Sequence, residues 1–365
     1  MTGTTDMTRC APRPLGPGPT EECEAAENLA AARLRVDLEL RAAVDSLPGW
    51  LRRTALHHFG REGADGTPAA GNAGKAARSA LVLTAVRALG GDPLTAVGAA
   101  AAVELTHNST LLHDTPLYDD VRDRDVTRRN RPAVWTAFGD ADASLAGDAL
   151  GRLAQRLLAE DPHPGAPAAA ARLAACAVEL RAGQRADRAL EGRALEDVSL
   201  EECLGTAEAK TGALLGCACA IGAVYAGAGA DTVAALDGFG RQAGLAFQLI
   251  DDVIGIWGDP ARTGTPARSD LAVRGMSLPV LAALASGTFE GAALAGLYGR
   301  GREAFAGDPE RVAQVVERAG GRDWAQSHAA DRMSRALGEL ARAVPDPVRA
   351  DGLLALTEYV TRRSY

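Results

Sequence analysis

Aromatic and β-branched residues are scarce in this sequence, and their scarcity argues against a protein built on β-sheets. Only 4% of the residues are Phe, Trp or Tyr, and strands favour these residues together with the β-branched ones. Ala, Leu, Arg and Glu dominate instead, and all four are good helix formers. With 47% hydrophobic residues, the 365-residue chain can bury a large core. The composition therefore predicts an all-helical protein.

The sequence also lacks a surplus of positive charge. Its 39 Lys and Arg residues are outnumbered by 47 Asp and Glu residues, which gives a formal net charge of -8. Proteins that bind nucleic acids neutralise the phosphates with clustered Lys and Arg side chains. We therefore expect no nucleic-acid partner.

Cysteine pairs and a secretion signal are missing as well. The six cysteines form no C-x-x-C pair and are too sparse for a disulfide scaffold, so we expect small buried thiols in a cytoplasmic protein. Residues 1–22 contain no apolar stretch of the kind that a secretion signal needs, and we expect a disordered tail there. The uncharged run 211–230 is long enough to cross a bilayer. Its many Ala and Gly residues favour a close-packed core helix over a membrane span.

Clusters of Gly, Pro and Asp divide the rest of the chain into helical stretches. The expected joints are residues 60–74, 160–167, 258–270, 307–310 and 344–347. No internal repeat is visible, and no linker is long enough to separate two cores. We expect a single domain over residues 23–365, a bundle of roughly ten or more helices around a central cavity, where bundles usually build their sites.

Two acidic blocks are the candidate metal ligands. In DDVRDRD, a helix would place Asp119 and Asp123 on one face with Asp120 beside them. In FQLIDD, Asp251 and Asp252 lie on an otherwise apolar helix, where two adjacent carboxylates are destabilised unless a cation accompanies them. A lone DDxxD in an acidic protein is more often a solvated helix face. Carboxylate oxygens are nevertheless the ligands that Mg²⁺ prefers.

Basic residues near these blocks strengthen the functional interpretation. Arg128 and Arg129 follow the first block directly, and Lys210 lies beside Thr211 in a second basic segment. Carboxylates that hold a metal, combined with several cations that bind an anion, are what a diphosphate site requires.

A series of short phrases, in the family's order, resembles the trans-isoprenyl diphosphate synthases. The phrases are Gly74, Lys75 and Arg78, then HNSTLLHD, DDVRD with TRRNRP, LAGDAL, GQRAD, AKTGALL, FQLIDD and SDL with SLPV. Together they extend from about residue 30 to residue 363. The resemblance implies the isoprenoid synthase fold and an Mg²⁺-dependent prenyltransferase that is commonly a homodimer.

The resemblance also implies a role for each candidate residue. The ligands of the Mg²⁺ ions that bridge an allylic diphosphate would be Asp119, Asp120, Asp123, Asp251 and Asp252. The phosphates of that substrate would be bound by Arg128 and Lys210. The second substrate, isopentenyl diphosphate, would be bound by Lys75, Arg78, His107 and Arg129. The groups that face the developing carbocation would be Thr211 and Gln248.

The sequence departs from the family's pattern at several positions. The insertion TPLYD follows Asp114, and five residues turn a helix by about 500°, which is not a whole number of turns. It stays open whether Asp114 or Asp119 leads the first acidic motif. Gly255 replaces the last aspartate of the second motif, Ser79 stands where a proline is usual, and the family's later lysines are replaced by Thr265, Gly275 and Met276.

Three functions remain open from the sequence. The intact set of isopentenyl diphosphate ligands favours an enzyme that elongates a prenyl chain. The lost lysines and the insertion leave a terpene cyclase on the same fold as the alternative, and an inactive regulatory subunit as the next. Ser109 and Thr110, one turn before the first motif, are small and favour geranylgeranyl diphosphate as the product.

Overall fold

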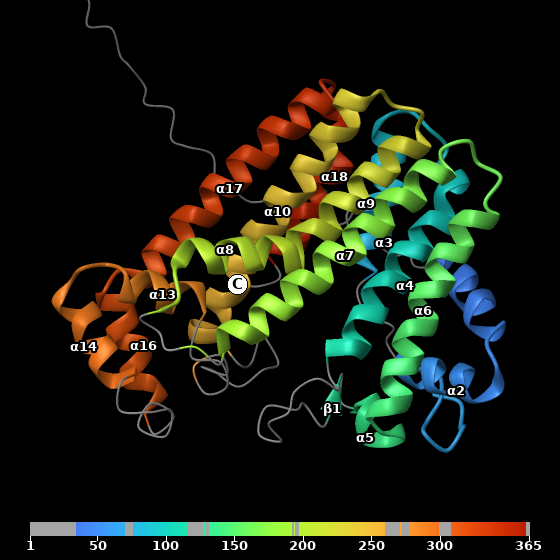
Figure 1. The fold of residues 1–365 in the computed structure, drawn as a ribbon. Helices are drawn as coiled ribbons and strands as arrows, with labels where there is room; N and C mark the ends of the chain where they lie inside the picture. The colour runs from blue at the N-terminus through green and yellow to red at the C-terminus, as the bar shows by residue number, and fades with distance from the viewer. Residues whose placement is uncertain are drawn as a thin grey trace, which may run out of the picture.

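The computed structural model describes residues 34–69, 76–114, 127–128, 131–191, 193, 197–259, 271, 277–298 and 308–362. Within these residues the fold is almost entirely helical, with fourteen labelled α-helices (Figure 1). The exception is a two-residue antiparallel ladder between β1, Thr127–Arg128, and β2, Arg131–Pro132. The prediction of an all-α bundle of ten or more helices is confirmed. The tail predicted for residues 1–22 lies outside the described residues.

The first half of the chain supplies one end of the bundle. After a helix over residues 34–45, its elements are α2 (Gly49–His58), α3 (Ala77–Ala88), η1 (Pro93–Ala96), α4 (Val97–Asp114), α5 (Val134–Phe138), α6 (Asp140–Glu160) and α7 (Ala166–Glu191). Helix α6 ends and α7 begins within the joint expected at residues 160–167.

The second half continues the bundle and adds a smaller group of helices. Its elements are α8 (Leu200–Ala207), η3 (Glu208–Gly212), α9 (Ala213–Tyr225), α10 (Ala230–Trp257), α13 (Leu278–Leu284), α14 (Phe289–Tyr298), α16 (Pro309–Arg318), α17 (Gly321–Ala343) and α18 (Pro347–Arg362). The Asp308 side chain caps α16 by accepting a hydrogen bond from the backbone N–H of Arg311, with Pro309 in the first turn. The joints expected at 307–310 and 344–347 are confirmed.

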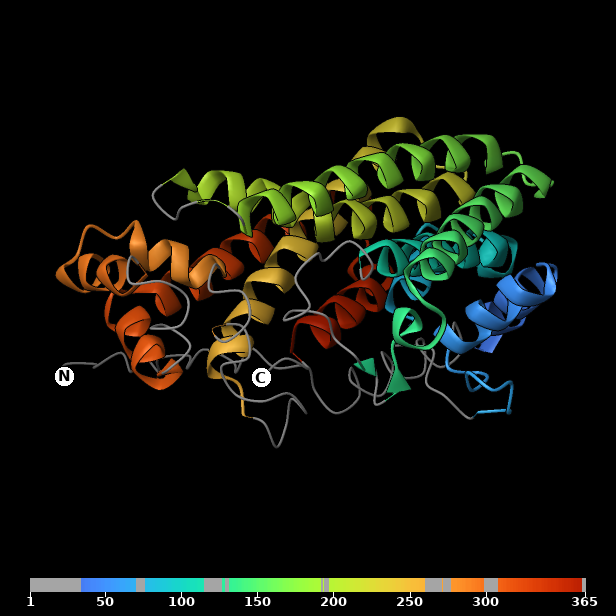
Figure 2. The ribbon, with the colours of Figure 1, turned by 60° about the horizontal axis from the view of Figure 1, so that its bottom comes forward.

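The long helices lie side by side and leave short ones at both ends. In Figure 1, α7, α9 and α10 cross the centre of the molecule, and α17 packs along α10 at the upper left margin. Helices α14 and α16 lie at one end, and α2 and α5 lie at the other. Figure 2 shows α7 (green) along one side of the bundle with α9 beneath it. This arrangement brings the segments around Lys210, Gln248 and Asp252 together on neighbouring elements.

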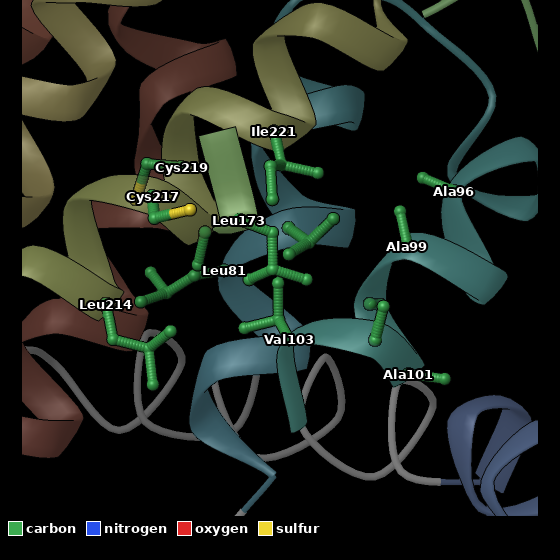
Figure 3. Packing of buried hydrophobic residues seen from close by; sticks show 14 of the residues in the cluster. Leu81, Ala96, Ala99, Ala101, Val103, Leu173, Leu214, Cys217, Cys219 and Ile221 are labelled. Atoms are coloured by element: carbon green, nitrogen blue, oxygen red, sulfur yellow. The ribbon is translucent and has the colours of Figure 1, made fainter. Parts of the chain in front are cut away.

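Helix α9 is the centre of the main hydrophobic core. Ile221 and Leu214 of α9 pack with Leu81 of α3 and Val103 of α4, and all four are buried (Figure 3). The helices approach closely because α9 carries glycine: a Cβ added to Gly222 would lie 2.5 Å from the backbone oxygen of Val82. Small residues at such contacts let backbones pack closely.

The uncharged run 211–230 was predicted as one core helix, but the structure ends that helix at Tyr225 and begins α10 at Ala230. The continuous helical run Leu200–Tyr225 is long and apolar enough to cross a membrane by length and composition alone, with a mean hydropathy of 1.3 over its most apolar window. However, 61% of that window is buried inside the protein. Its cysteines Cys203, Cys217 and Cys219 are buried free thiols, as the sequence predicted.

Candidate active site

The structure describes only part of the predicted site. The residues whose side chains it places are Arg78, His107, Lys210, Thr211, Gln248, Asp251 and Asp252. The predicted residues that lie outside the described part of the chain are Lys75, Asp119, Asp120, Asp123 and Arg129. Arg128 lies on β1, but its side chain is outside the description, as is the whole insertion after Asp114.

A π-helical turn carries Lys210 and Thr211, two of the residues predicted to be catalytic. Lys210 and Thr211 lie on η3, where the helix widens by one residue per turn between α8 and α9. Such turns are rare and are often found at functional sites. Gly183 of α7 makes room for the turn, because a Cβ at this position would lie 2.9 Å from the backbone nitrogen of Lys210. The widened turn sends its two neighbouring side chains to different helices.

Lys210 reaches α7, where it forms an ion pair with Asp187. Its Nζ lies 2.5 Å from Asp187 Oδ2, and both side chains are partly exposed. Asp187 belongs to the GQRAD phrase, but the sequence analysis assigned it no role. Asp187 and Lys210 are twenty-three residues apart, and no pattern in the sequence predicts that they pair. Only the packing of α7 against η3 brings them together.

Thr211 reaches α10 and begins a chain of hydrogen bonds. Its Oγ1 donates to Gln248 Oε1 over 2.9 Å, and Gln248 Nε2 donates to Asp252 Oδ1 over 2.8 Å. The other oxygen, Asp252 Oδ2, accepts the backbone N–H of Leu278 over 2.9 Å. Because an ionised carboxylate can only accept, Asp252 fixes which end of the Gln248 amide is its oxygen. That oxygen faces Thr211.

The two adjacent aspartates of the second block have different surroundings. Asp252 is only 8% exposed and is held by α10 and the start of α13. Asp251 is exposed, so its carboxylate is the one that solvent and ions can reach. Among the described residues no three His, Cys, Asp or Glu side chains cluster as a complete metal site. A metal held here would need ligands from beyond Asp251, as the predicted first block would supply.

The floor beneath this site is apolar. Leu245, Leu249 and Val253 of α10 form a buried cluster with Leu278 and with Cys203 of α8. Burial raises the pKa of Cys203 to about 11, and the nearby negative charges of Glu202, Asp187 and Asp252 act in the same direction. The thiol therefore stays neutral at physiological pH and behaves as a small apolar group.

The predicted residues on the other side of the site lie on two packed helices. Arg78 is in the first turn of α3 and His107 is in the second half of α4, and both are half-buried. Helices α3 and α4 contact one another. The structure thus brings the described part of the predicted isopentenyl diphosphate set to neighbouring elements.

Three side chains that we did not assign to catalysis have structural contacts. His113 Nε2 lies 2.9 Å from Asp148 Oδ1, and its Nδ1 lies 2.7 Å from the backbone oxygen of Ser109. Arg181 lies 3.7 Å from the same Asp148 oxygen, so Asp148 pairs with both His113 and Arg181. Trp257 packs at the edge of two apolar clusters, with the Arg322 guanidinium 5.4 Å from its ring centre.

Comparison with known proteins identifies this arrangement. Residues 67–317 match the family model described as polyprenyl synthetase. The chain belongs to the polyprenyl synthetase family. Over 325 residues it is 44% identical to the geranylgeranyl diphosphate synthase of Mycobacterium tuberculosis, with 89% of this chain and 90% of the relative covered. It is 42% identical over 328 residues to the (2E,6E)-farnesyl diphosphate synthase of the same organism, with 89% of each covered.

A solved structure supports the same conclusion. The crystal structure of a polyprenyl synthetase from Streptomyces coelicolor A3(2) matches with a TM-score of 0.82 at 40% sequence identity, covering 92% of this chain and 99% of that one. The chain is therefore a prenyltransferase with the isoprenoid synthase fold, as the sequence predicted. Members of the family generally depend on Mg²⁺.

Proposed function

We propose that this prenyltransferase condenses an allylic diphosphate with isopentenyl diphosphate to form a longer linear prenyl diphosphate. The observation that carries the proposal is the hydrogen-bonded chain from Thr211 through Gln248 to Asp252. It holds a neutral oxygen in a fixed orientation beside Thr211, which follows Lys210, the cation predicted to bind the diphosphate. An oriented dipole and a cation on neighbouring positions of η3 and α10 suit a reaction that separates positive carbon from negative diphosphate.

The allylic diphosphate would be bound by cations from two segments. We assign this role to Lys210 on η3 and to Arg128 on β1. The ion pair with Asp187 holds the Lys210 ammonium in place, partly exposed at the edge of the bundle, so that it remains accessible to an anion. Binding of the departing diphosphate to these cations lowers the barrier to its departure.

The metal ligands would come from both acidic blocks. Mg²⁺ would neutralise the charge that develops on the leaving diphosphate. The exposed carboxylate of Asp251 offers the oxygen donors that this ion prefers, and Asp119, Asp120 and Asp123 would supply the others. For Asp252 we propose a different role, because both of its oxygens accept hydrogen bonds from the protein. Its carboxylate orients Gln248.

The allylic carbocation would be stabilised and kept dry by α10. Gln248 Oε1 has a second lone pair beyond the one that accepts from Thr211, and its partial negative charge stabilises a cation that faces it. The buried cluster of Leu245, Leu249 and Val253 beneath the site excludes water, which would otherwise capture the cation.

The second substrate would approach from α3 and α4. We propose that Arg78 and His107, with Lys75 and Arg129, bind the diphosphate of isopentenyl diphosphate. The terminal double bond of this substrate then attacks the allylic carbon, one new carbon–carbon bond forms, and a proton is lost as the new double bond appears. A cyclase that ionises a single substrate has no chemical use for this second set of cations.

We favour geranylgeranyl diphosphate as the product. Two relatives of similar identity are a geranylgeranyl and a farnesyl diphosphate synthase, so similarity alone supports either length. Ser109 and Thr110 are small and buried, and each hydroxyl lies 2.7 Å from a backbone oxygen. Thr110 lies one turn before Asp114, so with Asp114 leading the first acidic motif a small side chain there leaves room for the longer product.

We also propose that the protein forms a homodimer and acts in the cytoplasm. Leu145 of α6 and Val178 of α7 are 49% and 71% exposed, and the Asp148–Arg181 pair joins these two helices at nearly the same level. Exposed apolar side chains on adjacent helices are typical of a surface that another subunit covers. Charged substitutions at both positions, followed by light scattering, would test this face.

Two incubations test the proposed reaction. Farnesyl diphosphate with isopentenyl diphosphate and Mg²⁺ should give a longer linear diphosphate, which extraction and mass analysis would detect. Geranylgeranyl diphosphate alone should give little hydrocarbon. Cyclic hydrocarbon from a single substrate, without elongated product, would contradict the proposal. Activity that appears only after a homologous partner is added would indicate a regulatory subunit.

A further inference from the structure

The first turn of α3 has no cap of its own. Its N-cap residue is Ala76, which adopts a left-handed conformation with φ 49° and makes no side-chain hydrogen bond to the helix. The first amide N–H groups of a helix have no acceptor within it. An oxygen on the N-cap side chain usually accepts one of them, and alanine has none.

Glu104 of α4 supplies the missing acceptor from another helix. Its Oε1 accepts the backbone N–H of Ser79, the third residue of α3, over 3.0 Å. The Ser79 hydroxyl lies 3.0 Å from the same oxygen and 2.9 Å from the Ala76 carbonyl oxygen. Both residues are buried, with exposures of 0% for Ser79 and 7% for Glu104. A carboxylate at a helix N-terminus is favoured by the helix dipole, which helps to offset its burial.

This contact joins the two elements that carry the predicted ligands of isopentenyl diphosphate. Ser79 directly follows Arg78 on α3, and Glu104 lies three residues before His107 on α4. Helix α4 is also fixed at the next residue, where Asn108 Nδ2 donates to the Glu104 backbone oxygen over 2.7 Å and Asn108 Oδ1 lies 2.9 Å from His58 Nε2. These hydrogen bonds of Asn108 hold the part of α4 that carries Glu104 in place.

We infer that Glu104 is a positioning residue: by capping α3 through Ser79, it sets the place of Arg78 relative to His107 in the isopentenyl diphosphate site. The inference rests on the proposed function, because it takes both residues as ligands of that substrate. It also explains Ser79, which stands where a proline is usual in the family. Proline has neither the N–H nor the hydroxyl, so a proline here would leave the buried Glu104 without these two donors.

Kinetics of Glu104→Ala, Glu104→Gln and Ser79→Ala test the inference. Glu104→Ala should raise the KM for isopentenyl diphosphate about tenfold, while kcat and the KM for the allylic substrate stay within about twofold, since only binding of one substrate is weakened. Glu104→Gln keeps an acceptor oxygen and should stay within about threefold of the parent. Ser79→Ala keeps the N–H but loses the hydroxyl, and should fall between the two.

Asp308→Ala is the matched control. Asp308 caps α16 by accepting the N–H of Arg311 over 3.0 Å, away from α3, so its loss should lower the melting temperature and leave both KM values unchanged. If Glu104→Ala behaves in the same way, Glu104 has only a structural role and the inference fails. Equal losses in Glu104→Ala and Glu104→Gln would also overturn it. If Glu104→Ala does not fold, Ser79→Ala takes its place as the test. A rise in its KM for isopentenyl diphosphate alone would then support the inference, and an unchanged KM would overturn it.

Two measurements separate this inference from the proposed function. Absence of condensation by the unaltered protein would refute the proposed function by itself. In that case calorimetric titration with inorganic diphosphate in the presence of EDTA judges the inference: Glu104→Ala should weaken the Kd about tenfold and Glu104→Gln should not. Amide hydrogen exchange should become faster at Ser79 in Glu104→Ala and remain unchanged in α16. Unchanged exchange at Ser79 would show that Glu104 does not cap α3.

Discussion

Gln248 donates its side-chain amide to Asp252 over 2.8 Å, one turn further along α10. Asp252 is in turn held by the N–H of Leu278 at the start of α13. These bonds give the two adjacent aspartates of the second acidic block different surroundings. Asp251 is exposed, whereas Asp252 is buried and connects Gln248 to α13.

The two aspartates should therefore respond differently to substitution. Asp251→Ala should raise the Mg²⁺ concentration needed for half-maximal rate by about tenfold or more, because a metal ligand is lost. Asp252→Asn should leave that concentration nearly unchanged and lower kcat by about tenfold to a hundredfold. Its amide can accept only one of the two hydrogen bonds and leaves a buried donor unsatisfied, at about 1–3 kcal/mol. Steady-state rates of both variants, measured over a series of Mg²⁺ concentrations, would test these expectations. If Asp252→Asn raised the Mg²⁺ concentration for half-maximal rate as much as Asp251→Ala does, Asp252 would be a metal ligand.

Lys210 should contribute to binding of the allylic substrate. Lys210→Ala should raise the KM for the allylic diphosphate about tenfold to a hundredfold, since a charge-assisted hydrogen bond contributes about 1.5–3 kcal/mol. Asp187→Asn should raise the same KM less, because the ammonium then loses its charged partner but keeps its charge. Steady-state kinetics with the allylic substrate varied would measure both changes. An unchanged KM in Lys210→Ala would remove Lys210 from the site.

The close packing of α9 and α10 should be sensitive to a single methyl group. A Cβ on Gly240 would lie 2.4 Å from the backbone oxygen of Leu215, whereas one on Gly338 of α17 would meet no atom within 4 Å. We expect Gly240→Ala to lower the free energy of unfolding by about 1–3 kcal/mol through overpacking. Gly338→Ala should raise it by about 0.5–1 kcal/mol through helix propensity. Thermal or urea unfolding of the two variants would decide, and equal effects would contradict the packing argument.

Much of the fold followed from the sequence because helical stretches are determined locally. The scarcity of aromatic residues predicted an all-α protein, and the Gly, Pro and Asp clusters marked where α6, α10 and α17 end. The joints at 160–167, 307–310 and 344–347 needed no tertiary information, because Pro and Gly disfavour helix wherever they occur. The ordered phrases also indicated the family, and the match of residues 67–317 to the polyprenyl synthetase model confirmed it.

The contacts that distinguish neighbouring residues were decided only by the tertiary structure. Asp251 and Asp252 are the same residue type at adjacent positions, and a helix rotates successive side chains by about 100°. Which of them is buried depends on the packing of α13 against α10. In the same way, Asp187 meets Lys210 and Glu104 meets Ser79 because separate helices pack together. A sequence lists the donors and acceptors, but their pairing depends on distances that arise only when the helices assemble.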